Sequence, residues 1–271
     1  MTSGGLIPLS QTYAEHSEPE VGGQRAEGGK PHKHSLSGVV PPQDMLNSGG
    51  VGAGSKPALV EINTDERNAR IAQMSWAELQ ASVAACTACP LHATRKQTVF
   101  GAGDEHPDWL LVGEGPGAEE DAQGEPFVGQ AGKLLDNMLA ALELKRGQKV
   151  YITNAVKCHA PDSRNPEVSE TEACAPYLAR QIALSRPRLI VALGKVAAQQ
   201  LLSTDTAVTR LRGKIHDYQG MPLAVTYHPA YLLRKPSEKA AAWQDLCLAR
   251  DTLWGDSERS PDEAKRNPGG L

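Results

Sequence analysis

Four short runs of almost continuous apolar residues alternate with segments of helical spacing, and this alternation constrains the fold more than any other feature of the chain. The runs occupy residues 109–115, 149–156, 188–194 and 222–228. Such runs are typical of strands buried on both faces. Helices are predicted at 131–144, 169–184, 195–202 and 237–253, and Ser169 with Glu172 has the form of a capping box at the second. The sequence therefore predicts an α/β fold of three layers, α/β/α, with a central parallel sheet of about four strands.

The two ends of the chain differ in composition from this middle part. Residues 1–74 are rich in Gly, Ser, Pro, His and Glu, with hardly any periodic apolar pattern, and residues 255–271 are similar. We predict a disordered N-terminal arm at 1–74, one folded domain at 75–254 and a disordered tail at 255–271. The start lacks the pattern of a signal peptide, and no run reaches about 18 apolar residues. A soluble protein of the bacterial cytoplasm or nucleoid is expected.

Charge limits the class of protein further. The formal net charge is −4, and most of it belongs to the two ends, so the predicted domain is nearly neutral. This excludes a strongly basic protein that coats DNA, but it allows a local basic patch.

The most polar positions of the four predicted strands lie at their carboxyl ends. These positions are the loop at 113–129, Asn154, Gly194 and His228. Ligands of open parallel sheets bind outside the carboxyl ends of the strands. We therefore expect the functional site at this edge.

The loop at 113–129 reads "GEGPGAEEDAQGEPFVG". Glycines after a strand resemble a dinucleotide fingerprint, in which a helix begins at once and holds the pyrophosphate. Here Pro116 interrupts the loop, three acidic residues follow at 119–121, and the next convincing helix is expected only near Ala131. Three carboxylates would repel a diphosphate, so a dinucleotide site is disfavoured. The loop is then either an ordinary strand-to-helix turn or a binding loop of another kind.

Four of the five cysteines have a spacing that suggests a metal site. They follow the pattern C-x2-C-x68-C-x15-C, with Cys86, Cys89, Cys158 and Cys174 as its members. Intracellular chains seldom keep structural disulfides, and four thiolates suit either zinc or a cubane iron–sulfur cluster. Four unrelated buried cysteines are the alternative, and Cys247 is interpreted as a core thiol.

Together these motifs resemble the family 4 uracil-DNA glycosylases, the iron–sulfur branch of the uracil-DNA glycosylase superfamily. The resemblance covers about 84–253 and includes the cysteine spacing, the loop at 113–129, "YITNAVKC", "LIVALG" and "HPAYLLR". It implies a [4Fe-4S] cluster on the four cysteines. It also implies a DNA repair enzyme of base excision repair that flips uracil out of DNA and hydrolyses its N-glycosidic bond. The free base is released and an abasic site remains.

The resemblance assigns three residues to the base. Phe127 would stack on the flipped ring, which is worth about 1–3 kcal/mol and does not choose among bases. Asn154 would accept a hydrogen bond from uracil N3–H and donate one to O4, whereas cytosine presents the opposite pattern. Glu120 would exclude the methyl group of thymine by steric conflict.

The resemblance also assigns catalytic and DNA-binding residues. His228 would donate a hydrogen bond to the charge that develops on uracil O2. The attacking water would be held by the Gly115 carbonyl, with Glu114 or Glu120 assisting electrostatically. Leu232, or else Tyr231, would fill the gap left by the flipped base. Phosphate contacts are expected at Arg234 and Lys195. No lysine is placed for Schiff-base chemistry, so a monofunctional enzyme is expected.

Two alternatives remain open. A non-catalytic iron–sulfur protein that binds DNA or senses redox state would keep the cysteines without needing Asn154, His228 and Phe127. Some relatives bind uracil-DNA covalently through a His in a basic inserted loop, but the segment that contains His159 is short and not notably basic. The expected partner is uracil-containing DNA, single- or double-stranded. A monomer is expected, with no membrane, and the arm is a candidate tether for another protein.

Overall fold

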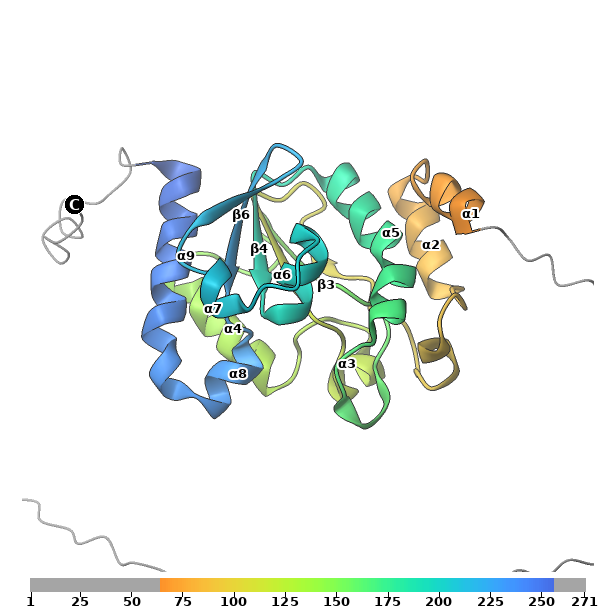
Figure 1. Ribbon diagram of the computed structural model, residues 1–271, viewed down its shortest axis with the longest axis horizontal. Helices are drawn as coiled ribbons and strands as arrows, with labels where there is room; N and C mark the ends of the chain where they lie inside the picture. Colours follow the sequence, from red (N-terminus) through yellow and green to blue (C-terminus); the bar gives the residue numbers. More distant parts are fainter. Residues whose placement is uncertain (1–63, 256–271) are drawn as a thin grey trace, which may run out of the picture. The chain divides into compact units, whose positions relative to one another are not determined.

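The computed structural model describes residues 64–255 of the chain (Figure 1). Residues 1–63 of the predicted arm, and the predicted tail beyond its first residue, lie outside the described residues. The predicted start of the domain at residue 75 is wrong, because helix α1 (Thr64–Ile71) already belongs to the folded unit. Ile71 is fully buried in a cluster with Leu79 and Val83 of helix α2 (Trp76–Ala84). The α1 sequence, TDERNARI, is too polar to show a helical period.

A six-stranded sheet forms the centre, in the order β1-β3-β2-β4-β6-β5. Its four inner strands are parallel and correspond to the four apolar runs, which confirms that part of the prediction. These strands are β3 (Val150–Asn154), β2 (Trp109–Gly113), β4 (Leu189–Leu193) and β6 (Met221–Thr226). Two short antiparallel strands, β1 (Ala102–Gly103) and β5 (Ile215–Tyr218), add the edges.

Helices cover both faces of the sheet, so the three-layer prediction is confirmed. Trp109 and Leu111 of β2 belong to the core with helices α4 (Gln130–Ala141) and α9 (Lys239–Trp254). Leu110 and Val112 belong to the core on the opposite face. That core is completed by α5 (Val168–Ser185), α6 (Lys195–Leu202) and α7 (Val208–Leu211). Side chains of a strand alternate between its faces, so one strand serves both cores.

A third apolar cluster lies beside the sheet and carries the cysteines. It joins α1, α2 and the 3₁₀ helix η1 (Pro90–Ala93) to α5, as Figure 1 also shows for α1, α2 and α5. The Trp76 ring contacts the rings of Phe100 and Tyr151 edge-on, with 5.3 Å between centroids in both pairs. These contacts attach the cluster to the outer part of the sheet.

Two helix starts differ from the prediction. Helix α5 begins at Val168, and its capping box consists of Glu167 and Glu170 instead of Ser169 and Glu172. The reason is that the Glu170 carboxylate accepts a hydrogen bond from the Glu167 backbone N–H at 2.8 Å. Helix α3 (Ala118–Gln123) begins directly after the glycines of the loop, where no helix was expected.

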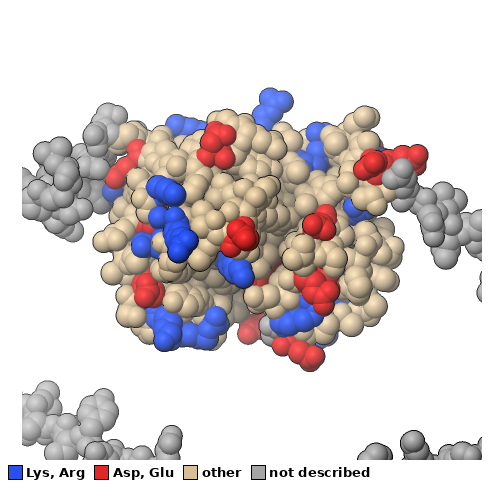
Figure 2. All heavy atoms as spheres, in the orientation of Figure 1, with Lys and Arg blue, Asp and Glu red and all other residues tan. Residues whose placement is uncertain are grey.

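The remaining elements are short. They are the 3₁₀ helix η2 (Pro161–Ser163), helix α8 (Pro229–Arg234) and the 3₁₀ helix η3 (Pro236–Glu238). In the part of the chain that the structure describes, no helix combines the length and apolar character needed to cross a membrane. On the face shown in Figure 2, basic and acidic side chains are interspersed, and basic ones gather near α8 and the start of α9.

Candidate active site and cysteine cavity

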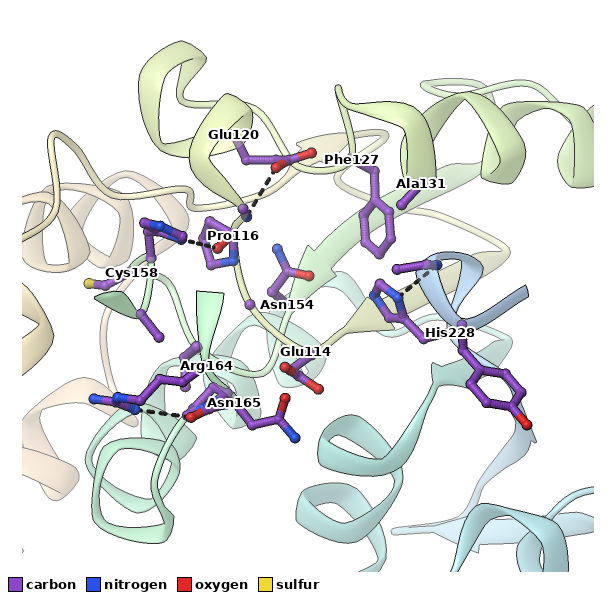
Figure 3. A pocket seen from close by; sticks show the side chains of 18 of the residues that line it. Glu114, Pro116, Glu120, Phe127, Ala131, Asn154, Cys158, Arg164, Asn165 and His228 are labelled. Carbon is purple, nitrogen blue, oxygen red and sulfur yellow. Dashed lines mark hydrogen bonds between the residues drawn. The ribbon is translucent and has the colours of Figure 1, made fainter. Parts of the chain in front are cut away.

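A cavity of about 380 Å³ opens at the carboxyl edge of the inner strands (Figure 3). Its walls come from the loop after β2, the end of β3 with the segment that follows it, and the start of α8. This volume suits a small ligand. Of the site residues predicted from the sequence, the cavity is lined by Glu114, Gly115, Glu120, Phe127, Asn154, Cys158, His228, Tyr231 and Arg234. Lys195 and Leu232 are not among its lining residues.

Asn154 is the last residue of β3 and lies beside Gly113 of β2 in the sheet. Its side chain is 1% exposed, and its Oδ1 has no hydrogen-bond partner. A buried acceptor without a partner costs about 1–3 kcal/mol. A Cβ at Gly113 would lie 2.3 Å from this Oδ1 and 2.6 Å from Phe127 Cζ. Glycine therefore lets Asn154 and Phe127 approach the same point, and a ligand donor would satisfy Oδ1.

Phe127 is held in an uncommon backbone conformation. Its φ is +56°, in the left-handed region that favours glycine, and its side chain is 6% exposed. Arg146 donates hydrogen bonds to the carbonyls of Pro126 at 2.7 Å and Phe127 at 2.9 Å. The Phe127 ring lies 5.4 Å from the His228 ring, with an angle of 29° between the planes. The aromatic ring is thus fixed before any ligand binds.

His228 caps the N-terminus of α8 with its ring. Nδ1 accepts a hydrogen bond from the Ala230 backbone N–H at 3.2 Å, so the proton of the neutral ring is on Nε2. Burial, reinforced by the positive charge of Arg234, lowers the pKa of His228 from 6.5 to about 4. The ring is therefore a neutral Nε2–H donor at physiological pH. Gly194 approaches it so closely that a Cβ there would lie 2.9 Å from His228 Cβ.

The acidic residues after the glycines mostly bind the protein's own backbone. Glu120 accepts hydrogen bonds from three backbone N–H groups, those of Gly117, Val128 and Gly129, at 2.9–3.1 Å. Asp121 is buried and accepts from the backbone N–H groups of Lys96 and Gln97. Of the three carboxylates at 119–121, only that of Glu119 is exposed. Glu120 also joins the start of α3 to the segment after Phe127.

Glu114 lies on the cavity wall across from these groups (Figure 3). Burial raises the pKa of its carboxyl group, while the positive charges of Arg234 and Lys195 act in the opposite direction. Lys195 is thus close enough to act on the cavity electrostatically without lining it. The wall therefore combines a partly desolvated acid with the cation Arg234, and Lys195 adds a second positive charge from outside the wall.

The four predicted cysteines surround one small cavity beside the first. Cys86, Cys89, Cys158 and Cys174 all line it, although they come from α2's end, the start of η1, the segment after β3 and α5. Arg95 donates to the Cys158 sulfur at 3.2 Å, and Arg67 to the Cys86 sulfur at 3.8 Å. Burial raises the pKa of Cys174 to about 12, and it also raises the pKa values of Cys158 and Cys89.

Four cysteines around one cavity are the kind of donor set that holds a zinc ion or an iron–sulfur cluster. In residues 64–255 no group of three or more Cys, His, Asp or Glu is arranged to hold one metal ion. Four thiolates around one zinc ion would lie only about 3.8 Å apart, given Zn–S bonds of about 2.3 Å. A cubane cluster separates its four ligands more widely, because each binds a different iron. The nearby cations suit the negative charge of such a ligand set.

Comparison with known proteins decides the family. The pattern described as "Uracil DNA glycosylase superfamily" matches residues 100–247. The type-4 uracil-DNA glycosylase of Pyrobaculum aerophilum is 42% identical over 183 residues, which are 65% of this chain and 93% of that protein. This chain belongs to the type-4 uracil-DNA glycosylases. Two further type-4 enzymes, from Archaeoglobus fulgidus (42%) and Thermotoga maritima (43%), each match 57% of this chain across 81% of their own length.

Leu232, which the family offset predicts to fill the gap left by the flipped base, lies away from the cavity. Leu232 is 1% exposed and lies in the apolar contact between α8, α4 and α9, so it does not reach the protein surface. Its neighbour Leu233 is 44% exposed, and Tyr231 lines the cavity. The short helix α8 decides this, because successive residues of a helix point about 100° apart.

Part of the cavity wall, in the segment after β3, is not predicted from the sequence. His159, Arg164 and Asn165 line the cavity. The His159 Nδ1–H donates to the Pro116 carbonyl at 2.8 Å, which ties the two loops together. Arg164 makes two hydrogen bonds with the carboxylate of Glu170, at 2.7 and 2.8 Å. In the sequence this segment resembles a linker, and the adjacency of His159 to a predicted cysteine ligand was its one signal.

Proposed function

We propose that this protein releases uracil from DNA by hydrolysing the N-glycosidic bond and leaves an abasic site, as a monofunctional enzyme of base excision repair. The names of its type-4 relatives support the substrate and reaction class. The observation that carries the proposal is the unpartnered Oδ1 of Asn154, buried beside the Phe127 ring. Such a pair provides one stacking surface and one unused acceptor.

Asn154 would choose uracil by its hydrogen-bond pattern. Uracil N3–H would donate to Oδ1, and the side-chain amide would donate to O4. Cytosine offers an acceptor at N3 and a donor at N4, so both partners would be left unpaired, at about 1–3 kcal/mol each. Phe127 would stack on the base without selecting it. Glu120 would limit space near C5, and its three backbone hydrogen bonds make it a rigid obstacle to a methyl group.

His228 would stabilise the leaving group. Its Nε2–H would donate to uracil O2 as negative charge develops there, and a preorganised donor of this kind is worth several kcal/mol. The neutral state matters, because the ring donates without first losing or gaining a proton. The Gly115 carbonyl would hold the attacking water, and the Glu114 carboxylate would stabilise positive charge on the sugar. No lysine is assigned a covalent role.

The rim of the cavity would bind the DNA backbone. Arg234 and Lys195 would contact phosphates, which position the DNA without reading its sequence. Leu233, with Tyr231, would fill the gap left by the flipped base in place of Leu232. The substrate is taken to be uracil in single- or double-stranded DNA, bound by a monomer. The enzyme would work where the genome lies, which in a bacterium is the cytoplasm.

The four cysteines would hold a [4Fe-4S] cluster with a structural function. When bound, such a cluster supplies cross-links between distant segments and not a catalytic step. Cys86 and Cys89 precede the sheet, Cys158 follows Asn154 by four residues, and Cys174 belongs to α5. Loss of these links would loosen the segment after β3 and so lower both stability and activity.

One assay tests the reaction and its alternatives. Protein purified without oxygen is incubated with a labelled uracil oligonucleotide, and strand breaks are measured with and without alkali. Breaks that need both uracil and alkali support the proposal, and Asn154→Ala should greatly slow their formation while leaving a measurable rate. A protein with cluster absorption near about 400 nm that never releases uracil would favour the non-catalytic alternative. A stable protein–DNA adduct lost in His159→Ala would favour the covalent one.

A further inference from the structure

Lys157 is a buried cation that forms a hydrogen bond with Asn154, the residue proposed to recognise uracil. Its side chain is 1% exposed, whereas lysine is almost never fully buried unless it is paired. The ammonium donates to Thr153 Oγ1 at 2.6 Å and to the Asn154 carbonyl oxygen at 2.8 Å. No carboxylate within residues 64–255 forms an ion pair with it. A salt bridge with a carboxylate therefore does not explain why the Lys157 ammonium is buried.

Lys157 lies between the two cavities. It lines the cysteine cavity together with the four cysteines, while its ammonium contacts the residue that lines the other cavity. The chain from Asn154 to Lys157 is attached on its other side to the glycine loop. The Ala155 N–H donates to the Gly113 carbonyl at 2.9 Å, and the Val156 N–H donates to the Glu114 carbonyl at 3.1 Å. The Lys157 ammonium closes this turn back onto its first residue.

The same side chain is anchored to the interior of the domain. Thr153 Oγ1 donates to the Phe100 carbonyl at 2.9 Å, and Gln181 Nε2 donates to that carbonyl at the same distance. Thr153 and Gln181 are fully buried. Lys157 is thus fixed at one end by its own backbone beside Cys158 and at the other by a buried polar network. It has little freedom to move independently of Asn154.

We infer that Lys157 is a positioning residue for uracil recognition, which holds Asn154 so that its Oδ1 faces the cavity. The inference rests on the proposed function. Lys157 does not line the cavity that Asn154 lines, and its effect passes through the Asn154 backbone. Lys157 also lines the cysteine cavity, so it links the four cysteines to Asn154, the residue proposed to read the base.

The full-length Lys157→Met variant tests this inference. Methionine is similar in length and removes both hydrogen bonds. Gln181→Met is the matched control, because it removes buried hydrogen bonds from the same network without touching Lys157 or Asn154. Both variants are compared at equal iron content for uracil release and for inhibition by free uracil. We expect a loss in kcat/KM of about 10- to 100-fold in Lys157→Met, with weaker inhibition by uracil, because small misplacements of a reading group have effects of this size.

A double-mutant cycle separates positioning from general stability. If Lys157 acts through Asn154, adding Lys157→Met to Asn154→Ala should cause no further loss of activity. Equal losses in both backgrounds, or an equal loss in Gln181→Met, would overturn the inference. If neither Lys157→Met nor Lys157→Gln folds with normal iron content, Lys157 serves folding alone and the inference is also overturned. An unmodified protein that releases no uracil would instead refute the proposed function.

Discussion

Gly113→Ala should disable the site without unfolding the protein. The new Cβ would lie 2.3 Å from Asn154 Oδ1 and 2.6 Å from Phe127 Cζ, whereas ordinary contacts begin at 3.4 Å. Asn154 Oδ1 would therefore have to move by about 1 Å, and a displacement of that size in a reacting or reading group costs about 100-fold in rate. Gly113 does not have a positive φ, so alanine fits its backbone, and overpacking should cost only about 1–3 kcal/mol of stability.

The assay is single-turnover release of uracil from a labelled oligonucleotide, with the melting temperature measured on the same samples. Gly129→Ala is the control. Its Cβ would come no closer than 3.3 Å to its nearest neighbour, the carboxylate of Glu119, an exposed side chain that can move. If Gly113→Ala and Gly129→Ala release uracil at the same rate, the close approach of Asn154 and Phe127 is not needed, and the reasoning about the site fails.

Further outcomes are expected for His228, for the two leucines of α8 and for Arg146. In an NMR titration, the His228 imidazole should stay neutral, with its proton on Nε2 only, down to about pH 5, since its pKa is about 4. Between pH 4 and 6.5 the histidine is protonated in the unfolded state but neutral in the folded state, so the free energy of unfolding should rise by about 3 kcal/mol as the pH increases over this range. Titration of His228 near pH 6.5 in the folded protein would contradict this. Leu232→Ala should cost about 2–5 kcal/mol in denaturant unfolding. Leu233→Ala should leave stability unchanged and slow uracil release from double-stranded more than single-stranded DNA, and the reverse pattern would restore Leu232 as the inserted residue. Arg146→Ala should free the Phe127 carbonyl and raise KM for the oligonucleotide, while an unchanged KM would show that the ring needs no such support.

The sequence predicts the inner sheet well because each inner strand is buried on both faces and so must be apolar throughout. The edge strands β1 and β5 escape prediction, since one has two residues and the other includes His216 and Asp217. Helix α1 escapes because Ile71 is its one buried residue, and further contacts come from a polar side chain, Arg67. Local polar contacts, which leave little trace in apolar patterns, decide such details.

The candidate site, like the fold, is predicted from the sequence only in part. Glycines, Asn154 and His228 at strand ends can be placed at one edge from topology alone. The choice between Leu232 and Leu233 depends on the phase of a six-residue helix, which counting from His228 does not fix. The role of Glu120 as an acceptor for three N–H groups depends on a loop conformation that only the folded chain defines.

The backbone bonding of Glu120 and Asp121 affects how a negatively charged polymer meets this edge. An approaching phosphate encounters one freely hydrated carboxylate, Glu119, where the sequence shows three in a row. Two of these three carboxylates, those of Glu120 and Asp121, are directed inward, where they offset the partial positive charges of N–H groups. Anionic side chains can therefore hold the loop rigid without repelling DNA strongly. The dependence of the association rate on salt concentration should then be governed by the basic residues around α8.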